Sequence, residues 1–139
     1  MEGKIINLIF DACALIAFLH DEYGAETAEI LLLDASNVCY VHAINLCEVF
    51  YDFLHRADES EAQEAIQTLL STGLNLNNDL DFSFWQQVGR YKAELRRVSL
   101  ADCFCLALAH RIGGTIVTTD HHEFDPIVEK GIVPIKFIR

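Results

Sequence analysis

The sequence predicts a single α/β domain in which helices flank a parallel sheet. Short apolar segments rich in β-branched residues, typical of buried strands, alternate with longer segments of helical periodicity. Strands that alternate with helices form parallel sheets, because each helix carries the chain back across the sheet. A length of 139 residues fits one domain over 1–139, and a hydrophobic content of 52% supplies its core.

Five segments are expected to form strands. The first is apolar and rich in Ile, and it ends at Asp11. The clearest is the β-branched segment 115–118, which leads to Asp120. The last contains Pro134, which suits an edge strand because proline lacks an N–H donor. The predicted strands are 5–10, 37–41, 74–76, 115–118 and 133–138.

Helices are expected between these strands, from apolar periodicity and capping residues. Ser60 and Ser99 are predicted to cap two of them, Asp125 a short one that begins at Pro126, and Asp79 and Asp81 are interpreted as turn and cap residues. The predicted helices are 12–19, 24–33, 43–57, 60–70, 81–97, 100–112 and 126–130.

The five cysteines are interpreted as reduced, small core residues. Their number is odd, each lies in an apolar stretch, and none forms a Cys-x-x-Cys pair of zinc-finger spacing. Reduced thiols agree with a cytoplasmic protein. The N-terminal residues 1–4 run straight into a strand without a secretory segment, and no apolar stretch reaches the roughly 18 residues of a membrane span. We therefore expect a cytoplasmic location and no membrane contact.

The net charge of −11 argues against tight, non-specific binding of nucleic acid. Two considerations reduce this objection. A carboxylate cluster that binds a divalent cation contributes several of the negative charges, and an acidic surface attracts a basic partner protein.

Four acids are the strongest candidates for chemistry. Asp11 and Asp120 directly follow predicted strands, and the carboxyl ends of parallel strands are where α/β folds bind ligands. Glu48 and Asp102 lie inside apolar helices, with no Lys or Arg three or four residues away. Since a buried carboxylate without a partner is costly, we expect the four to converge on Mg²⁺ or Mn²⁺. Such ions activate water and stabilise displacement at phosphorus.

Each acid also has an ordinary structural interpretation. Asp11 and Asp120 suit the caps of the helices that follow them. Glu48 suits a solvent-facing flank, and Asp102 suits the first turn of a helix capped by Ser99. The occurrence of all four acids together favours the metal site.

Four segments around these acids resemble the PIN-domain family, and within it the toxin ribonucleases of VapBC toxin–antitoxin pairs. They are 9–17, 45–49, 99–102 and 118–124, and they are spread over almost the entire chain. The resemblance implies a doubly wound, three-layer α/β/α fold with a central, mostly parallel sheet of about five strands. It also implies an endoribonuclease that depends on Mg²⁺ or Mn²⁺, with Asp11, Glu48, Asp102 and Asp120 as its metal-binding and catalytic acids.

Further residues near these motifs are candidate auxiliary groups. Glu123 is a candidate to share the metal role of Asp120, and Asn45 lies one turn before Glu48 and is placed to orient it. Cys13 stands where the family often has Ser or Thr, and a thiol is a weak hydrogen-bond partner. The auxiliary candidates are Glu123, Asn45, Ser99 and Thr119.

Other residues in these regions have simpler interpretations. His121 and His122 are expected at the surface or behind the ligands rather than as Mn²⁺ ligands. The aromatic residues near the predicted helix 81–97 are expected to be core or partner contacts rather than base-stacking groups: Phe82, Phe84, Trp85 and Tyr91.

Three alternative functions remain open at this stage. A receiver-like regulatory domain also places acids at strand ends, but the first strand here offers one Asp, and Lys136 lies inside a strand. A non-catalytic interaction module of the same fold would use its acidic surface for binding alone. A DNA-directed nuclease of related fold usually carries basic or helical insertions that this short chain lacks.

The resemblance also implies partners besides RNA. We expect a cognate antitoxin whose basic C-terminal segment places an Arg or Lys among the four acids, where it competes with the metal for the same oxygens. We also expect a homodimer built from helical faces near residues 24–70, because a small monomer does not readily hide this many apolar residues.

Overall fold

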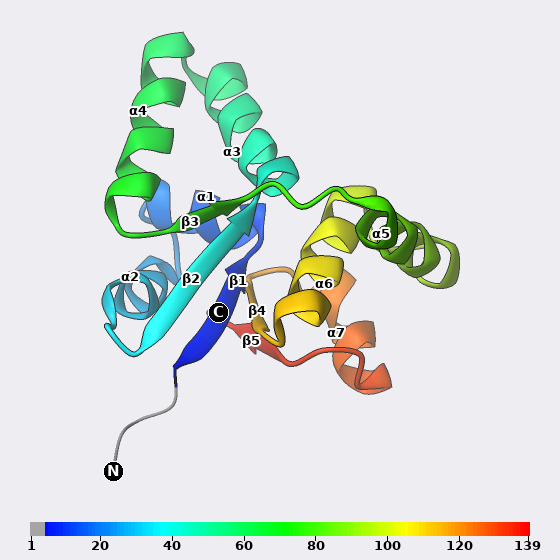
Figure 1. Cartoon of the computed structure of the whole chain (residues 1–139). Coiled ribbons are helices and arrows are strands. Elements are labelled where there is room, and N and C mark those ends of the chain that lie inside the picture. The colour runs from blue at the N-terminus through cyan, green and yellow to red at the C-terminus, as the bar shows by residue number, and fades with distance from the viewer. Residues whose placement is uncertain (1–4) are drawn as a thin grey trace.

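A single five-stranded parallel sheet organises the chain. The structure is a computed structural model that describes residues 5–139. Within these residues the strand order is β3-β2-β1-β4-β5, and every neighbouring pair is parallel (Figure 1). The strands are β1 (Ile6–Phe10), β2 (Asn37–His42), β3 (Asn75–Asn77), β4 (Thr115–Thr118) and β5 (Ile135–Phe137). The predicted α/β class is confirmed, whereas residues 1–4, which bear on the predicted absence of a secretory segment, lie outside the described part.

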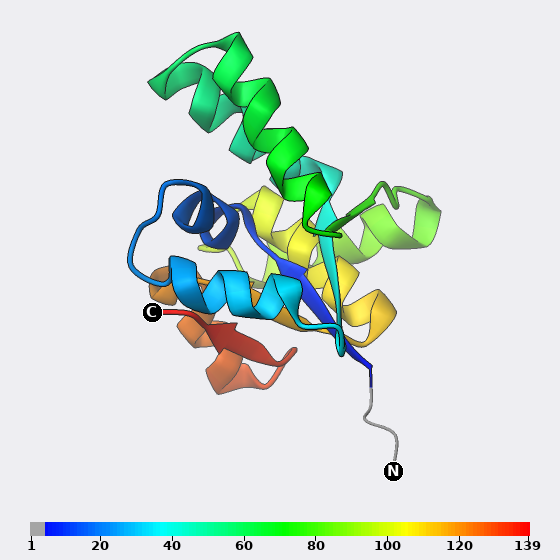
Figure 2. The ribbon, with the colours of Figure 1, turned by 90° about the vertical axis from the view of Figure 1, so that its left-hand side faces the viewer.

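The helices cover both faces of the sheet, and two of them extend beyond it. α3 and α4 form a hairpin that projects away from the strands in both views (Figures 1 and 2). Across residues 5–139 the helices are α1 (Ala12–Leu19), α2 (Ala25–Leu33), α3 (Ala43–Arg56), α4 (Glu59–Ser71), α5 (Phe82–Glu94), α6 (Leu100–Ile112) and α7 (His121–Lys130).

Alternation along β1 creates two hydrophobic cores. Successive side chains of a strand point to opposite faces of the sheet. Leu8 and Phe10 accordingly pack with residues of α1, α2 and α3, whereas Ile9 packs with residues of α5, α6 and α7. These three side chains are almost fully buried, and each such burial contributes about 1.5–3 kcal/mol. The result is the three-layer α/β/α architecture.

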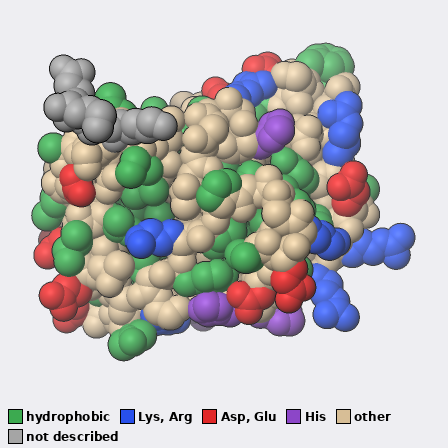
Figure 3. Space-filling view, turned by 90° about the horizontal axis from the view of Figure 1, so that it is seen from below, with side chains coloured by type: hydrophobic (Ala, Val, Ile, Leu, Met, Phe, Trp, Pro, Cys, Tyr) green, Lys and Arg blue, Asp and Glu red, His purple; other side chains and the backbone are tan. Residues whose placement is uncertain are grey.

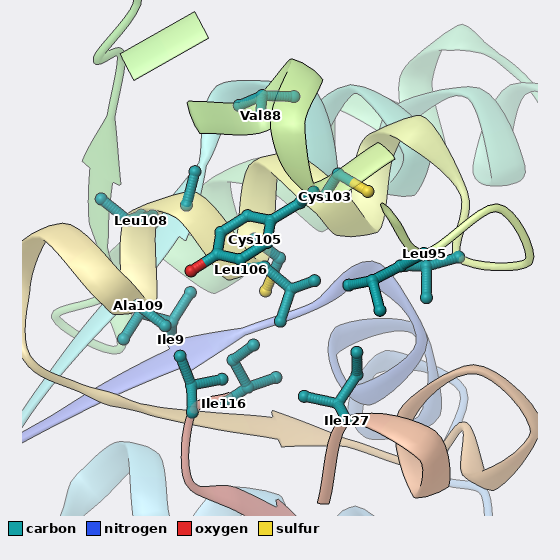
Figure 4. Close-up of a cluster of buried hydrophobic side chains, with 14 of the residues drawn as sticks. Ile9, Val88, Leu95, Cys103, Cys105, Leu106, Leu108, Ala109, Ile116 and Ile127 are labelled. Atoms are coloured by element: carbon teal, nitrogen blue, oxygen red, sulfur yellow. The ribbon is translucent and has the colours of Figure 1, made fainter. Parts of the chain in front are cut away.

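The helix α6 is the most deeply buried of the described helices. Four of its side chains are fully buried: Cys103, Cys105, Leu106 and Leu108. They lie among side chains of β1, β4, α5 and α7 (Figure 4). Gly114, which follows α6, allows β4 to approach β1. A Cβ atom at this position would lie 2.9 Å from the backbone oxygen of Asn7, so a larger residue does not fit without movement.

Several predicted helix ends are wrong by a few residues. α4 begins earlier than expected, because Asp58 rather than Ser60 accepts an N–H of the first turn. α5 ends at Glu94 rather than residue 97, because the chain turns there. α7 begins at His121, since Asp120 accepts an N–H of its first turn, and Asp125 lies inside this helix rather than at its cap.

The prediction that all five cysteines are core residues is wrong for two of them. Cys39, Cys103 and Cys105 are buried, but Cys13 and Cys47 are exposed because neighbouring apolar residues take the core-facing positions of their helices. All five thiols are free. Within the described residues, no helix is both long and apolar enough to cross a membrane.

Candidate metal centre

Asp11 is held rigidly at the end of β1. Its side chain is fully buried, and one carboxylate oxygen accepts the backbone N–H of Ala14 at 2.8 Å, which caps α1. The other oxygen accepts the hydroxyl hydrogen of Thr118. The helix-cap and candidate-ligand interpretations therefore describe the same carboxylate.

Burial makes ionisation of Asp11 unfavourable. The pKa of Asp11 is raised from 3.8 to about 7, mainly by the loss of solvation on burial, and the nearby charges of Asp120 and Glu48 contribute to the increase. The hydrogen bonds from Thr118 and Ala14 oppose this change only in part. A divalent cation would favour the ionised form, because it would place an opposite charge beside this buried carboxylate.

Thr118 connects two of the predicted acids, although it is not among the site residues predicted from the sequence. Its hydroxyl oxygen donates to Asp11 and accepts the backbone N–H of Asp120 at 2.9 Å. Thr118 is fully buried at the end of β4, the neighbour of β1 in the sheet. The sequence signal is a hydroxyl residue at a strand end beside the acid, but the predicted auxiliary residue Thr119 is half-buried, and it is Thr118 that binds Asp11.

Three acids come together where α6 and α7 begin. Carboxylate oxygens of Asp102, Asp120 and Glu123 all lie within 4.8 Å of one another. Asp120 accepts the N–H of Glu123 at 3.0 Å, so the cap of α7 also fixes the separation of these two residues. Hard oxygen donors at this spacing suit a cation such as Mg²⁺ or Mn²⁺.

Ser99 joins the first turns of α6 and α7. Its hydroxyl oxygen accepts the backbone N–H of Asp102 at 3.1 Å, as predicted for the cap of α6. Its own backbone N–H donates to Glu123 at 2.8 Å. This arrangement resembles a capping box, except that the acid comes from another helix. It positions Asp102 and Glu123 before any ion is bound.

Glu48 approaches the cluster from α3. Its side chain is half-buried, and burial raises its pKa, with a smaller contribution from the charge of Glu123. Asn45 donates to Glu48 across 3.5 Å and to the backbone oxygen of Ala101 at 3.1 Å. Its side-chain oxygen is buried without a hydrogen-bond partner in the described chain, which leaves an acceptor beside the acids.

The structure therefore divides the predicted acids into two sets. Asp102 and Asp120 lie in the three-acid group together with Glu123, which the sequence suggested as an auxiliary residue. Asp11 and Glu48 lie near enough to influence one another electrostatically, but outside that group. His121 is exposed and stacks on Phe137, and it does not belong to the group either.

A comparison with sequence models of protein families identifies the family. The sequence model of the PIN domain matches residues 8–129, which is most of the chain, and the chain belongs to the PIN-domain family. A comparison with curated protein sequences finds no significant match.

Solved structures share the fold at low sequence identity. VapBC-1 from Haemophilus influenzae is 14% identical with a TM-score of 0.71, over 96% of this chain and 98% of that one. VapBC2 from Rickettsia felis, bound to a promoter DNA fragment, is 16% identical with a TM-score of 0.73, over 95% and 98%. VapC20 from Mycobacterium tuberculosis, a sarcin–ricin loop cleaving toxin, is 16% identical with a TM-score of 0.69, over 86% and 94%.

The raised pKa of Asp11 predicts an unusual effect of its removal. Because the pKa in the folded state is about 7 and the ordinary value is 3.8, ionised Asp11 destabilises the metal-free fold increasingly from about pH 4 to about pH 7. Asp11→Asn should therefore raise the free energy of unfolding in EDTA at pH 8, by at most about 4 kcal/mol, and this gain should shrink as the pH falls. Urea unfolding between pH 5 and pH 8 measures it.

A second capping aspartate provides the control. Asp58 caps α4 by accepting the N–H of Glu61 at 2.8 Å, but it is exposed. Asp58→Asn should leave the free energy of unfolding within about 0.5 kcal/mol of the parent. If Asp11→Asn is less stable than the parent at pH 8, ionisation of Asp11 does not destabilise the metal-free fold.

Proposed function

We propose that this protein is an endoribonuclease that depends on Mg²⁺ or Mn²⁺ and acts in the cytoplasm as the toxin of a type II toxin–antitoxin pair. The observation that carries the proposal is the group of Asp102, Asp120 and Glu123 at the carboxyl end of a PIN-domain sheet. A further support is that one similar structure, VapC20, is a toxin that cleaves the sarcin–ricin loop.

The donor set fits a hard divalent cation. Asp102, Asp120 and Glu123 would hold it, with Asp11 and Glu48 adding negative charge nearby. When bound, such an ion supplies an activated water and stabilises charge on the phosphodiester oxygens. The hydrogen bonds of Thr118 and Ser99 keep the carboxylates at their positions despite mutual repulsion. The half-buried carboxylate of Glu48, oriented by Asn45, is placed to accept a proton from a water molecule at this cluster.

Cleavage of a structured RNA tests the activity. The parent should cleave with Mn²⁺ and stop in EDTA, and Asp102→Asn and Asp120→Asn should each reduce the rate by roughly 100-fold or more. Because asparagine can also cap a helix, the loss in Asp120→Asn reports on the metal site rather than on the folding of α7. Mn²⁺ at 100 times its dissociation constant should stabilise the parent by about 2.7 kcal/mol in thermal melts.

The exposed cap variant Asp58→Asn is again the matched control, and it should cleave like the parent. Cleavage that continues in EDTA would contradict the proposal. A melting temperature that does not change in millimolar Mn²⁺ would contradict the metal site directly.

We also propose a cognate antitoxin with a basic C-terminal segment that enters the acidic cluster. Several similar structures are VapBC toxin–antitoxin complexes, which supports a partner of this kind. An inserted guanidinium would pair with carboxylates and displace the cation, and the net charge of −11 would speed its approach at low salt.

Inhibition of RNA cleavage by the cognate antitoxin should weaken as the salt concentration rises. It should also weaken, by about tenfold or more, when the inserted Arg or Lys is replaced by Ala. A titration of cleavage against antitoxin concentration measures both effects. An antitoxin that inhibits equally well without its C-terminal segment would show that the cluster is not the inhibited site.

A homodimer through residues 24–70 is the third part of the proposal. Exposed apolar side chains are frequent there, among them Tyr51 at 62% and Ile30 at 61%. A largely apolar groove of about 320 Å³ runs between α3 and α4 and is lined by Ala43, Leu46, Cys47, Phe50, Gln63, Ile66 and Leu76. Such surfaces are typical of subunit contacts.

Light scattering at micromolar concentration should give twice the chain mass of 15.7 kDa. Tyr51→Glu should shift the protein toward monomer, because a buried charge without a partner is unfavourable at an interface. Phe82→Glu changes an exposed aromatic residue outside the proposed interface and should leave the dimer intact. A monomeric mass for the parent would refute the dimer and leave the nuclease assignment standing.

A further inference from the structure

The positive charges of this acidic protein are unevenly distributed. Five of its ten Lys and Arg residues lie between positions 90 and 111, where only two of its twenty-one acids occur. Four of the five lie in the basic segment 90–97, which comprises the end of α5 and the following turn. Figure 3 shows Lys and Arg side chains gathered at its right-hand side, where α5 lies in Figure 1.

The turn after α5 carries two exposed arginines and is fixed by buried side chains and hydrogen bonds. Leu95 and Val98 are buried, at 6% and 3% exposure, whereas Arg96 and Arg97 between them are exposed. The backbone N–H of Val98 donates to the oxygen of Leu95 at 2.9 Å and closes the turn. The ammonium group of Lys92 donates to the backbone oxygens of residues 96 and 98, at 2.9 and 2.8 Å.

The two arginines have no acidic partner in the described chain. Within residues 5–139, neither Arg96 nor Arg97 forms an ion pair, whereas Arg111 binds Asp79 and Asp81. The side chain of Arg111 therefore joins the end of α6 to the start of α5. The guanidinium groups at 96 and 97 remain available to an external anion.

The same turn leads directly into the candidate metal centre. Arg97 lies two residues before Ser99, so their Cα atoms are at most about 7 Å apart. Ser99 binds both Asp102 and Glu123 of the acidic cluster. The turn that carries two exposed arginines thus leads into a group of carboxylates that by itself repels nucleic acid.

We propose that Arg96 and Arg97 bind phosphate groups of the RNA beside the bond that is cut. This inference rests on the proposed ribonuclease function and names the contact that brings a polyanion to an acidic protein. Guanidinium groups bind phosphate oxygens in bidentate fashion, and these contacts position a strand without reading its sequence. The local excess of positive charge compensates for a net charge of −11 that would otherwise disfavour RNA.

Salt-dependent binding of a fluorescent single-stranded RNA tests the proposal in an Asp120→Asn background, where cleavage is suppressed. Adding Arg96→Ala and Arg97→Ala should weaken binding by about tenfold or more. It should also reduce the slope of log K against log salt by about 1.4, because each phosphate contact on a single strand contributes about 0.7. In the cleaving protein the same pair should raise KM and leave kcat within about twofold.

Lys130→Ala with Lys136→Ala is the matched control, because it removes two exposed positive charges, at the end of α7 and on β5, that lie outside the basic segment 90–97. It should change neither the slope nor KM beyond a small general effect of charge. If the arginine pair and this control have equal effects, or if the arginine pair has none while the parent cleaves RNA, the inference fails and the proposed function stands. A parent that neither binds nor cleaves RNA overturns both.

Discussion

Carboxylates that gather at one edge of a sheet repel one another, and this fold holds them together with hydrogen bonds from the backbone and from hydroxyl groups. Asp11, Asp102 and Asp120 each lie in or before the first turn of a helix, where N–H groups lack partners within the helix. Thr118 ties the end of β1 to the end of β4, and Ser99 ties α6 to α7. The parallel sheet supplies the common edge at which these contacts meet, so the geometry of the acids depends on the strand order.

Much of the fold was predictable because the local signals agree with the final packing. The β-branched segment at 115–118 and the helix that begins after Ser99 have the predicted bounds. Competing caps caused the errors at the starts of α4 and α7. Asp58 and Ser60 are both good caps near the start of α4, and only the folded backbone decides between them. The exposure of Cys13 was equally hidden, since α1 is apolar all round and its sequence does not reveal which side faces the core.

The site was predictable as a set of residue types but not as a geometry. Asp102 and Asp120 were identified from their positions, whereas the role of Glu123 depends on a contact with Ser99, 24 residues away in sequence. Thr118 is followed by a second threonine, and the sequence does not show which of the two hydroxyl groups lies beside Asp11. The net charge of −11 also appeared to oppose RNA binding, because a sum over the chain does not show that the basic segment 90–97 adjoins the acids.

The bond between Ser99 and Glu123 has a thermodynamic consequence for the assembly of the centre. The first turns of α6 and α7 are already joined in the metal-free protein, so folding has met the entropic cost of aligning them. A cation that binds here meets carboxylates that are already in position. The affinity of the site for the cation therefore reflects the exchange of water for carboxylate oxygens rather than the ordering of a loop. Glu123 also becomes an internal competitor, because an ion that takes the oxygen now bound to Ser99 must leave that N–H group in need of another acceptor.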